Sequence, residues 1–347
     1  FMKILITGGG GFLGLHLASY LNKKGNKLTL VDIQKFDRKE YPHSVTLATC
    51  DVRNKKELEK LIKGHDVVVH AAAALPLWKK KDIYSTNVNG TRNVLELSKK
   101  HDVKKVIFIS STAVYGVPKK HPIEESDRRI GVGAYGKSKI LAEDLCFRAV
   151  EKGQHVTTIR PKTFVGTGRL GVFEILFDWI HDGKRIPIIG KGSNRYQLLD
   201  VDDLVETIYL FALKNINLYD GPFNIGAQEF GSVKEDLGEL FKFAKSGSKI
   251  LPTPAFIVKK ALFLFEKLGV SPLYQWVYDT ADKDSFVSIE KIKKTLDWIP
   301  KYSNAQALIK SYRWYLENYN KIKSKASGVT HTVGWKQGIL KLFKYIA

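Results

Sequence analysis

The chain has 347 residues, of which 44% are hydrophobic and 26% charged, proportions that are typical of a globular protein and exclude a disordered or fibrous one. Its 56 Lys and Arg against 35 Asp and Glu give a formal charge of +21, yet the aromatic residues do not alternate with basic ones as a nucleic-acid groove requires, so no nucleic-acid partner is expected. The two cysteines, Cys50 and Cys146, exclude a disulfide framework and a cysteine-rich zinc site, and we expect a cytoplasmic protein without a metal.

Short apolar runs alternate with helical patterns through the first half of the chain. Strands this rich in Val and Ile, separated by helices, indicate a parallel sheet that is covered on both faces. The fold class is therefore α/β, a doubly wound parallel Rossmann sheet with a smaller C-terminal substrate lobe. The strands are predicted at residues 3–7, 27–31, 45–49, 66–70, 104–110 and 155–160, and the helices from residue 15 and at about 55–63, 82–100 and 134–151.

The regular alternation loosens after residue 160. A glycine-rich segment at 166–171 precedes an apolar stretch at 172–181, and helices are predicted at 201–213 and, after two prolines, at 255–268. The expected organisation is a dinucleotide-binding domain, a substrate lobe, and a basic linker with an amphipathic C-terminal segment, at residues 1–165 (completed by about 196–226), 166–195 with 227–318, and 319–347 respectively.

A glycine motif joins the first predicted strand to the first helix. Gly8, Gly11 and Gly14 allow a tight turn, close approach of the backbone to a pyrophosphate, and close packing of the helix on the strand. The second strand ends at Asp32, whose carboxylate would accept hydrogen bonds from a ribose diol and repel a 2′-phosphate. The motif therefore predicts an NAD site. Basic residues three and six positions after this aspartate leave NADP as the less favoured alternative.

Four hydroxyl or amine side chains are predicted to meet near that site. Tyr135 and Lys139 are four residues apart, on one face of a helix. An ammonium beside a phenol is expected to lower the phenol's pKa from its usual value of ~10, which suits a general acid/base. Ser110 and Ser111 end a buried strand, where side chains point into the crevice that binds ligands in parallel sheets.

These features resemble the extended short-chain dehydrogenases/reductases, also called the NAD-dependent epimerase/dehydratase family. The resemblance covers about residues 2–315 and depends on many motifs in the family's order. They are TGGGGFLG (7–14), Asp32, Asp51-Val52, HAAA (70–73), NVNGT (87–91), SSTAVYG (110–116), YGKSK (135–139), Arg160-Pro161 and DVDD (200–203).

The resemblance implies a role for individual residues. Tyr135 would be the acid/base, Lys139 would bind the ribose hydroxyls and tune Tyr135, and Ser111 would hydrogen-bond the reacting oxygen. The other cofactor-binding residues that it implies are Phe12 and Leu13 in the turn, Asp51 and Val52 beside the adenine, and Ala71, Ala72, Ala73, Asn87, Ser110 and Pro161. The substrate-binding residues would be Thr112, Phe164, Arg169 and Arg195.

The sequence also departs from this family's pattern in informative ways. Dehydratases and decarboxylases of the family place an acid just after the catalytic serine or threonine, where this chain has Thr112 and Ala113, so neither reaction is expected. Nucleotide-sugar members usually have an arginine at the position of Tyr196, and residues 279–290 contain no arginine to bind a diphosphate. Lys162, Arg169 or Arg195 would have to replace them.

Two amphipathic segments suggest contact with an anionic membrane surface. In the predicted helix 255–268, Phe256 and Phe263 lie among lysines, and residues 334–347 repeat an aromatic and lysine pattern. The alternative is that the C-terminal segment docks on the protein body or on a second subunit. No stretch approaches the ~20 apolar residues that cross a bilayer, so we expect a cytoplasmic protein that associates with membrane through its C-terminal segment.

The prediction for function is an NAD-dependent oxidoreductase of the extended family, acting at a secondary alcohol or ketone of an apolar or lipid-linked small molecule, as a 3β-hydroxysteroid dehydrogenase or a ketoreductase does. The apolar stretch at 170–180 supports this substrate class, although a core helix or a dimer face would explain it equally well. One alternative is a nucleotide-sugar 4-epimerase, and a second is a non-catalytic NAD-binding regulator. A homodimer through helices 82–100 and 134–151 is implied by the resemblance alone.

Overall fold

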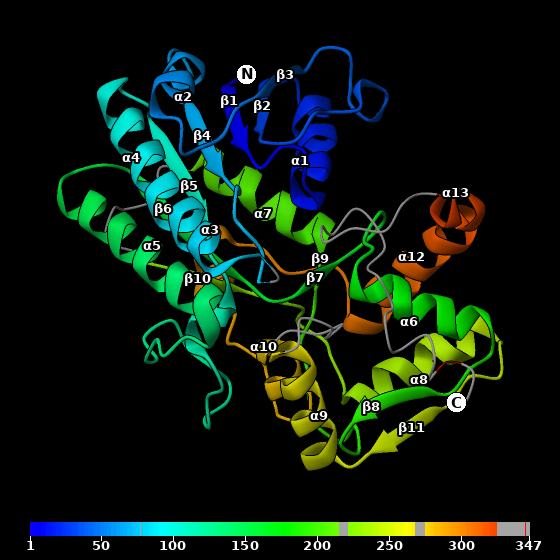
Figure 1. Ribbon diagram of the computed structural model, residues 1–347. Helices are drawn as coiled ribbons and strands as arrows, with labels where there is room; N and C mark the ends of the chain where they lie inside the picture. The colour runs from blue at the N-terminus through cyan, green and yellow to red at the C-terminus, as the bar shows by residue number, and fades with distance from the viewer. Residues whose placement is uncertain (77, 215–220, 268–274, 325–343, 345–347) are drawn as a thin grey trace.

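The computed structural model describes all residues except 77, 215–220, 268–274, 325–343 and 345–347. Its centre is a parallel sheet of seven strands in the order β10-β6-β5-β4-β1-β2-β3 (Figure 1). The order reverses direction between β1 and β4, which is the switch point at which doubly wound sheets bind ligands. The strands are β1 (Lys3–Thr7), β2 (Lys27–Asp32), β3 (Thr46–Thr49), β4 (Val67–His70), β5 (Lys105–Ile109), β6 (Val156–Pro161) and β10 (Phe223–Ile225).

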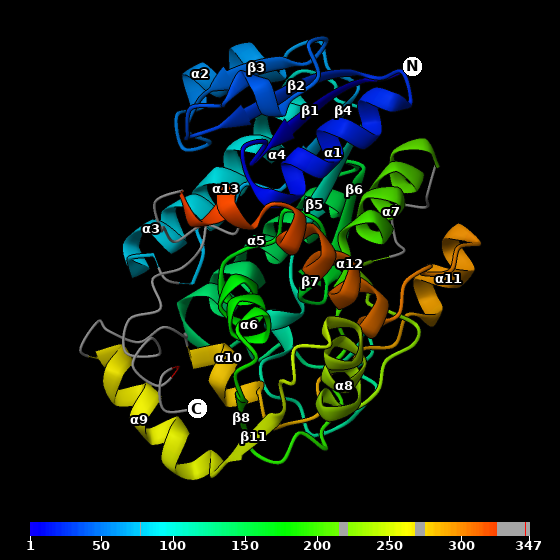
Figure 2. The same ribbon diagram turned by 90° about the vertical axis from the view of Figure 1, so that its right-hand side faces the viewer.

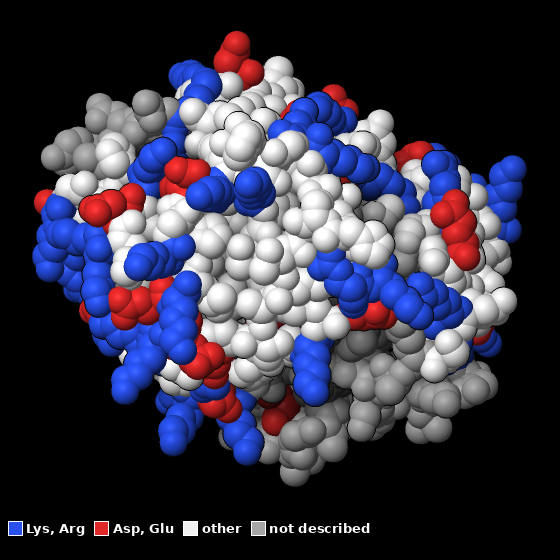
Figure 3. Space-filling model, turned by 90° about the horizontal axis from the view of Figure 1, so that it is seen from above, with Lys and Arg blue, Asp and Glu red and all other residues white. Residues whose placement is uncertain are grey.

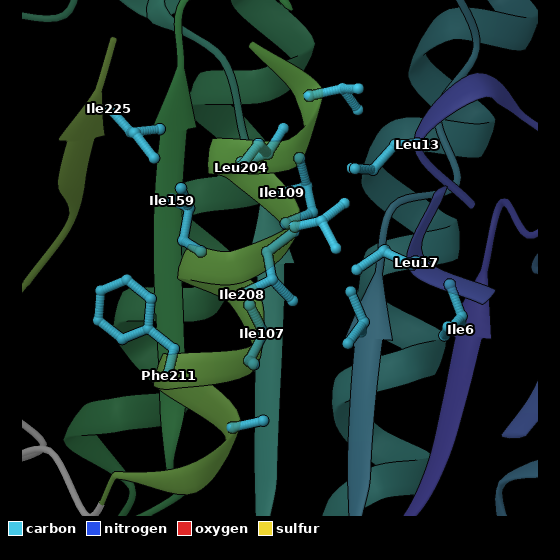
Figure 4. Packing of buried hydrophobic residues seen from close by; sticks show 14 of the residues in the cluster. Ile6, Leu13, Leu17, Ile107, Ile109, Ile159, Leu204, Ile208, Phe211 and Ile225 are labelled. Atoms are coloured by element: carbon cyan, nitrogen blue, oxygen red, sulfur yellow. The ribbon is translucent and has the colours of Figure 1, made fainter. Parts of the chain in front are cut away.

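Helices cover both faces of this sheet, so the α/β Rossmann prediction is confirmed. On one face lie α1 (Phe12–Lys23), α7 (Val201–Leu213) and α11 (Glu290–Leu296), and on the other α2 (Lys55–Ile62), α4 (Thr91–Lys100) and α5 (Gly133–Glu151). Figure 4 shows how the first face packs, with Leu13, Leu17, Leu204, Ile208 and Phe211 of the helices against Ile6, Ile107, Ile109, Ile159 and Ile225 of the strands.

The predicted helix 82–100 is divided in three. The structure has α3 (Lys80–Tyr84), a π-helical turn over Ser85–Gly90, and α4. Gly90 ends this turn and lets it pack against Val52, because a Cβ there would lie 2.6 Å from a methyl group of Val52. Single π turns inside helices are frequent at functional sites.

The later segments build a second group of elements beside the sheet. Figures 1 and 2 show α6 (Val172–His181), α8 (Val233–Ala244), β8 (Ile186–Ile189) and β11 (Ile250–Thr253) on the side of the molecule away from β1–β3, with α12 (Asn304–Glu317) between. These helices share one hydrophobic core, in which Phe177, Leu240 and Tyr315 are fully buried. The apolar stretch at 172–181 is thus a helix that contributes to this core. Two further strands, β7 (Phe164–Val165) and β9 (Leu199–Asp200), pair between the two groups of elements.

The C-terminal region departs in part from the prediction. Residues 319–323, expected as the start of a linker, form α13 (Tyr319–Lys323), whose Tyr319 ring stacks on His181 of α6 at 4.3 Å. The predicted amphipathic segment at 334–347 lies outside the described residues apart from Lys344. That lysine pairs with Asp178, and with Asp182 at 2.8 Å, which is the contact expected if the segment docks on the protein body.

On one face of the molecule the basic charge is distributed rather than gathered. On the face shown in Figure 3, Lys and Arg side chains are spread around the rim with acidic side chains among them. None of the described helices is both long enough and apolar enough to cross a membrane.

Candidate active site

The turn between β1 and α1 is closed by glycines that a larger residue could not replace. Gly8 has a φ of +73°, and a Cβ on it would lie 2.8 Å from the backbone carbon of Ala71. A Cβ on Gly14 would lie 2.5 Å from the carbonyl oxygen of Gly8. Strand, turn and helix therefore pack together only because these positions lack a side chain. The N-terminus of α1 opens here onto a cavity, and its unpaired N–H groups favour a pyrophosphate.

This cavity follows the carboxyl ends of the strands from the glycine turn to α5. Most of the residues that the sequence predicted for the site line it. From the turn and the strand ends these are Gly8, Gly11, Phe12, Leu13, Asp32, Asp51, Val52, Ala71, Ala72, Ala73, Ser110, Ser111 and Pro161, and from the following segments Tyr135, Lys139, Phe164 and Arg169. Four predicted residues are not among its lining, namely Gly14, Asn87, Thr112 and Arg195.

Asp32 is held in a single orientation at the end of β2. Its Oδ2 accepts a hydrogen bond from the backbone N–H of Gly10 at 2.9 Å, and its Oδ1 accepts one from Gln34 at 3.0 Å. The backbone thus positions a negative charge at the edge of the cavity, where β1 and β4 separate it from β5 and Ser111. This is the place at which a carboxylate binds a ribose diol and repels a 2′-phosphate.

Asp51 carries a charge that Arg53 compensates. Nη2 of Arg53 donates to Oδ2 of Asp51 at 2.6 Å, and Nε donates to the same carboxylate at 2.9 Å. Burial alone would raise the pKa of this carboxyl, but the hydrogen bonds from Arg53 outweigh it and hold the pKa below its ordinary value. The cavity wall at Asp51 therefore keeps an ionised carboxylate at neutral pH.

The wall formed by Ala71–Ala73 is anchored through His70, the last residue of β4. Its Nδ1 lies 2.7 Å from the hydroxyl of Thr7 in β1, and its Nε2 lies 3.0 Å from the hydroxyl of Thr91 in α4. Burial lowers the pKa of His70 to about 3, so the ring is neutral. Its two hydrogen bonds connect β1 to α4.

Asn87 positions other residues instead of lining the cavity. Its side-chain oxygen accepts from the backbone N–H of Ala74 at 2.8 Å, and its Nδ2 donates to the hydroxyl of Ser138 at 3.0 Å. Ser138 in turn donates to the carbonyl oxygen of Tyr135 at 2.7 Å. Asn87 therefore connects the cofactor wall to the first turn of α5.

The structure brings Ser111, Tyr135 and Lys139 together at the inner end of the cavity. Ser111 follows β5 in an extended conformation, and its Oγ accepts from the backbone N–H of Ala113 at 3.1 Å. Ser111 lies close enough to Tyr135 for its hydroxyl to favour the phenolate form of the tyrosine and lower its pKa. Lys139 lies one turn along α5 with its Nζ 6.0 Å from the centre of the tyrosine ring, and it donates to the carbonyl oxygen of Ile109 at 2.9 Å.

The ionisation of this group differs from the expectation. Burial raises the pKa of Tyr135 to about 12, and the groups that oppose this shift are the Ser111 hydroxyl and the positive charge of Arg169. Burial also lowers the pKa of Lys139 to about 8. The expectation that the lysine holds the tyrosine's pKa below 10 is therefore wrong, because desolvation of the phenolate exceeds the attraction of an ammonium that is itself buried.

Two of the predicted substrate residues, Phe164 and Arg169, line the cavity. Arg169 packs its guanidinium against the rings of Phe12 and Phe164, at 5.2 and 5.4 Å from their centres. Thr112, by contrast, donates its hydroxyl to the carbonyl oxygen of Pro161 at 3.3 Å and is buried beside the cavity. It supports the strand end beneath the site.

Arg195 points away from the site. Its guanidinium lies between the rings of Phe230 and Phe286, 4.6 and 4.9 Å from their centres, and Nη2 donates to the carbonyl oxygen of Phe230. The next residue, Tyr196, is the one that turns inward, where its ring lies 4.8 Å from the Nζ of Lys162. Arg195 therefore does not supply to the site the guanidinium that family members usually have at the position of Tyr196.

Lys162 lines the cavity. The sequence pattern suggests this residue only as a replacement for a diphosphate-binding arginine. It comes directly after β6, and the rule that strand ends in parallel sheets carry site residues would have identified it. Trp78 and Thr86 also line the cavity, and no local pattern in the sequence indicates them.

Comparisons with known proteins agree with this geometry. Residues 4–226 match the model of a family described as the NAD dependent epimerase/dehydratase family. The chain is 33% identical over 344 residues to the protein y4nG of Sinorhizobium fredii, covering 98% of this chain and 85% of that one. It is 32% identical over 226 residues to the N-acetyl-alpha-D-glucosaminyl-diphospho-ditrans,octacis-undecaprenol 4-epimerase of Escherichia coli O157:H7, covering 62% of this chain and 64% of the relative.

A solved structure shows the same fold. The UDP-glucuronic acid 4-epimerase from Bacillus cereus, in complex with NAD, superposes with a TM-score of 0.76 and 23% identity, covering 92% of this chain and the whole of that one.

Proposed function

Because the chain belongs to the NAD-dependent epimerase/dehydratase family, we propose that it catalyses hydride transfer at a secondary alcohol or ketone carbon of a lipid-linked substrate. The observation that carries this proposal is that Ser111, Tyr135 and Lys139 line the inner end of one cavity that begins at the glycine turn, with Lys139 one turn along α5 from Tyr135. NAD is the cofactor of this family, and the residues present fit it.

The residues that would hold NAD follow from the cavity wall. The glycine turn and the N-terminus of α1 would bind the pyrophosphate, Asp32 the adenosine ribose, and Ala71–Ala73 the nicotinamide half. When bound, NAD supplies the hydride acceptor or donor. Lys139, whose ammonium is largely retained at neutral pH because its pKa is about 8, would bind a ribose hydroxyl and keep a positive charge near the phenol.

The chain's own chemistry is proton transfer at the substrate oxygen. Ser111 and Tyr135 place two hydroxyls at one point of the cavity wall, so a substrate hydroxyl bound there would be hydrogen-bonded by both. The pKa of Tyr135, about 12, keeps the phenol protonated. Tyr135 would therefore donate its proton to a carbonyl oxygen during reduction and recover one during oxidation.

The charges of the wall support simple hydride transfer over dehydration or decarboxylation. Among the described residues that line the cavity, the carboxylates are Asp32 and Asp51, both at its adenosine end. The positions after Ser111 hold Thr112, which bonds to Pro161, and Ala113. The described wall thus offers no carboxylate beside the reacting group to take a carbon-bound proton.

An exposed apolar helix supports a lipid-linked substrate. In α9 (Ala255–Lys267), Phe256 is 70% exposed and Ile257 64%, with Phe263 and Leu264 about half exposed. Lys260 lies 4.2 Å from the centre of the Phe256 ring. Rings with an adjacent ammonium are typical of helices that lie in the membrane interface, and the E. coli relative is named for a diphospho-undecaprenol-linked sugar.

Not every lysine of α9 lies on this exposed face. Lys259 does not belong to the exposed face, because its Nζ pairs with Asp282 at 2.5 Å and the side chain is largely buried. The proposed membrane-contact surface is therefore the set Phe256, Ile257, Lys260, Phe263 and Leu264.

A nucleotide-sugar 4-epimerase is the second candidate. The observation that favours it is Arg169, whose guanidinium lines the cavity between aromatic rings and could bind a diphosphate. An epimerase would reduce and reoxidise the cofactor within one turnover and would release no NADH. A non-catalytic regulator is disfavoured by the assembled serine, tyrosine and lysine.

Nucleotide binding separates the two candidates. Thermal unfolding of the NAD-loaded protein would be measured with UDP, GDP, dTDP and CDP, each in excess. A nucleotide at ~100 times its dissociation constant would add about 2.7 kcal/mol to the free energy of unfolding. Stabilisation by one of the four would establish the nucleotide-sugar candidate and identify its base, whereas no stabilisation by any would favour the lipid-linked substrate.

Vesicle flotation tests the membrane half of the proposal. The full chain should float with anionic phospholipid vesicles, and a variant with Phe256→Ser and Phe263→Ser should remain in the soluble fraction. Ile299→Ser is the matched control, because Ile299 is 56% exposed outside this surface. If the unmodified protein fails to float, the membrane-surface part of the proposal is wrong.

A further inference from the structure

A buried lysine that pairs with none of the described acidic residues forms part of the reaction cavity. Lys162 is 1% exposed to solvent, yet its side chain lines the same cavity as Ser111, Tyr135 and Lys139. Its backbone N–H donates to the carbonyl oxygen of Ile225 at 2.9 Å, which continues the pairing of β6 with β10 by one residue. The sheet therefore fixes the position of its Cα.

The groups that surround the ammonium are neutral. Its Nζ donates to the hydroxyl of Ser285 at 2.7 Å and lies over the ring of Tyr196. Burial lowers its pKa to about 7, and no carboxylate offsets that shift. A buried ammonium is costly unless an anion or several hydrogen bonds compensate it.

Arg160, two residues earlier, is a buried cation whose charge is compensated by a carboxylate. It is equally buried, and its guanidinium donates to both oxygens of Glu143. Lys162 has no such counterpart, although it lies next to the same strand end. The difference indicates that the compensating anion is supplied from the cavity.

The distribution of charge along the cavity agrees with this. Its described carboxylates, Asp32 and Asp51, are at the adenosine end, whereas Lys139, Lys162 and Arg169 are at the reacting end. A substrate group that enters the reacting end meets positive charge on several sides.

We propose that Lys162 is the anion-binding residue of this site, and that its ammonium binds a carboxylate or phosphate group that the substrate carries close to the reacting carbon. Ser285 would orient the ammonium, and the ring of Tyr196 would support it. The inference deepens the proposed function by assigning the substrate a negative charge near the Ser111–Tyr135 pair. Lys162 is in this sense a specificity-determining residue.

The test uses small anions on the NAD-loaded full chain. Thermal unfolding would be followed at constant ionic strength while sodium chloride is replaced by sodium acetate or by sodium phosphate. We expect the melting temperature of the unmodified protein to rise with one of these anions and to saturate, and Lys162→Met to abolish the rise. Acetate as the effective anion would indicate a substrate carboxylate, and phosphate would indicate a phosphate group.

Matched variants keep the result interpretable. Lys162→Arg retains the charge and should retain the response, and Lys152→Met removes an exposed lysine at the far end of α5 and should respond as the unmodified protein does. No response in the unmodified protein, or a response that Lys162→Met preserves, would overturn the proposal.

The outcome is independent of the proposed reaction. Tyr135→Phe should block hydride transfer while leaving the anion response intact, because the phenol is not part of the anion site. Failure to detect any NAD-dependent reaction would therefore count against the proposed function alone, and failure of the anion response would count against Lys162 alone.

Discussion

Arg160 and Glu143 form a buried ion pair that joins the sheet to α5, the helix that carries Tyr135. Nε of Arg160 donates to Oε1 of Glu143 at 2.8 Å, and Nη2 donates to Oε2 at 2.7 Å. Glu143 lies in α5, eight residues after Tyr135, and it also accepts a hydrogen bond from Ser110 at 2.6 Å. The pair thus connects the ends of β5 and β6 to α5, so that the serine strand and the tyrosine helix keep one relative position.

Removing the charge of Glu143 should strongly destabilise the protein. Glu143→Gln leaves the buried guanidinium of Arg160 without its counter-ion, and breaking a buried pair in this way costs about 3–5 kcal/mol. Urea denaturation measures the loss. Glu151→Gln, at the exposed end of the same helix, should change the free energy of unfolding by less than about 0.5 kcal/mol. Equal effects of the two substitutions would show that the pair does not stabilise the fold.

Removing the phenolic hydroxyl of Tyr135 should lower the turnover of the substrate without changing the affinity for NADH. Tyr135→Phe leaves the ring in place but removes the proton that the substrate oxygen needs, and we expect turnover to fall by about 10²–10⁴. NADH affinity, measured by fluorescence titration, should be unchanged. Tyr209→Phe, on α7, is the control. A Tyr135→Phe enzyme with normal turnover would assign the proton transfer to another group.

The glycine turn should tolerate no side chain at Gly14. A methyl group there would lie 2.5 Å from the carbonyl oxygen of Gly8, so Gly14→Ala must displace α1 and should cost about 1–3 kcal/mol of stability together with NADH affinity. Gly238→Ala in α8 meets open space and should stabilise by about 0.4–1 kcal/mol. Calorimetry and NADH titration of both variants test this. Retention of full NADH affinity by Gly14→Ala would contradict the role of the turn.

Asp32 should determine the choice between the two dinucleotides. Because backbone N–H groups hold its carboxylate at the end of β2, it is placed to repel a 2′-phosphate. Asp32→Ser should narrow the preference for NADH over NADPH by about tenfold or more, equivalent to ~1.4 kcal/mol. Dissociation constants for both cofactors give the ratio. Asp37→Ser is a control on the exposed loop that follows, and it should leave the ratio unchanged.

The buried ammonium of Lys162 should give stability a defined pH dependence. Its pKa is about 7 in the folded chain, against 10.5 when solvated. Below pH 7 both states bind the proton and the full cost of burial is present. Between pH 7 and 10.5 the unfolded chain binds more protons, so the contribution of Lys162 to the free energy of unfolding rises with pH.

The Lys162→Met variant lacks the ammonium and therefore lacks this pH-dependent contribution to the free energy of unfolding. It should be more stable than the unmodified protein at pH 7, and the difference should shrink as the pH rises toward 10. Urea denaturation at several pH values, in the absence of phosphate and carboxylate buffers, measures it. A difference that is constant with pH would mean that the ammonium is not destabilised by burial.

The site residues could be predicted from sequence wherever their positions depend on local geometry. The strand, glycine turn and helix around Gly8 follow from chain conformation alone, and Tyr135 and Lys139 share a helix face because they are four residues apart. Ser111 could be placed because the carboxyl ends of parallel strands meet at one edge of the sheet. Asn87 and Thr112 belong to recognisable motifs, and Arg195 is next to the position at which the family usually has an arginine, but neither fact specifies which way a side chain turns.

The sequence by itself determined the doubly wound sheet, the NAD turn and the group of Ser111, Tyr135 and Lys139, since each depends on contacts between residues close in the chain or on a general rule of strand order. The tertiary structure alone decided the remainder, including the pairing of β8 with β11, the direction of Arg195 and the contact of Lys344 with α6. It also decided the raised pKa of Tyr135 and the uncompensated burial of Lys162. These depend on desolvation and on charges from distant segments, and no local pattern in a sequence records how much water a folded chain removes from a group.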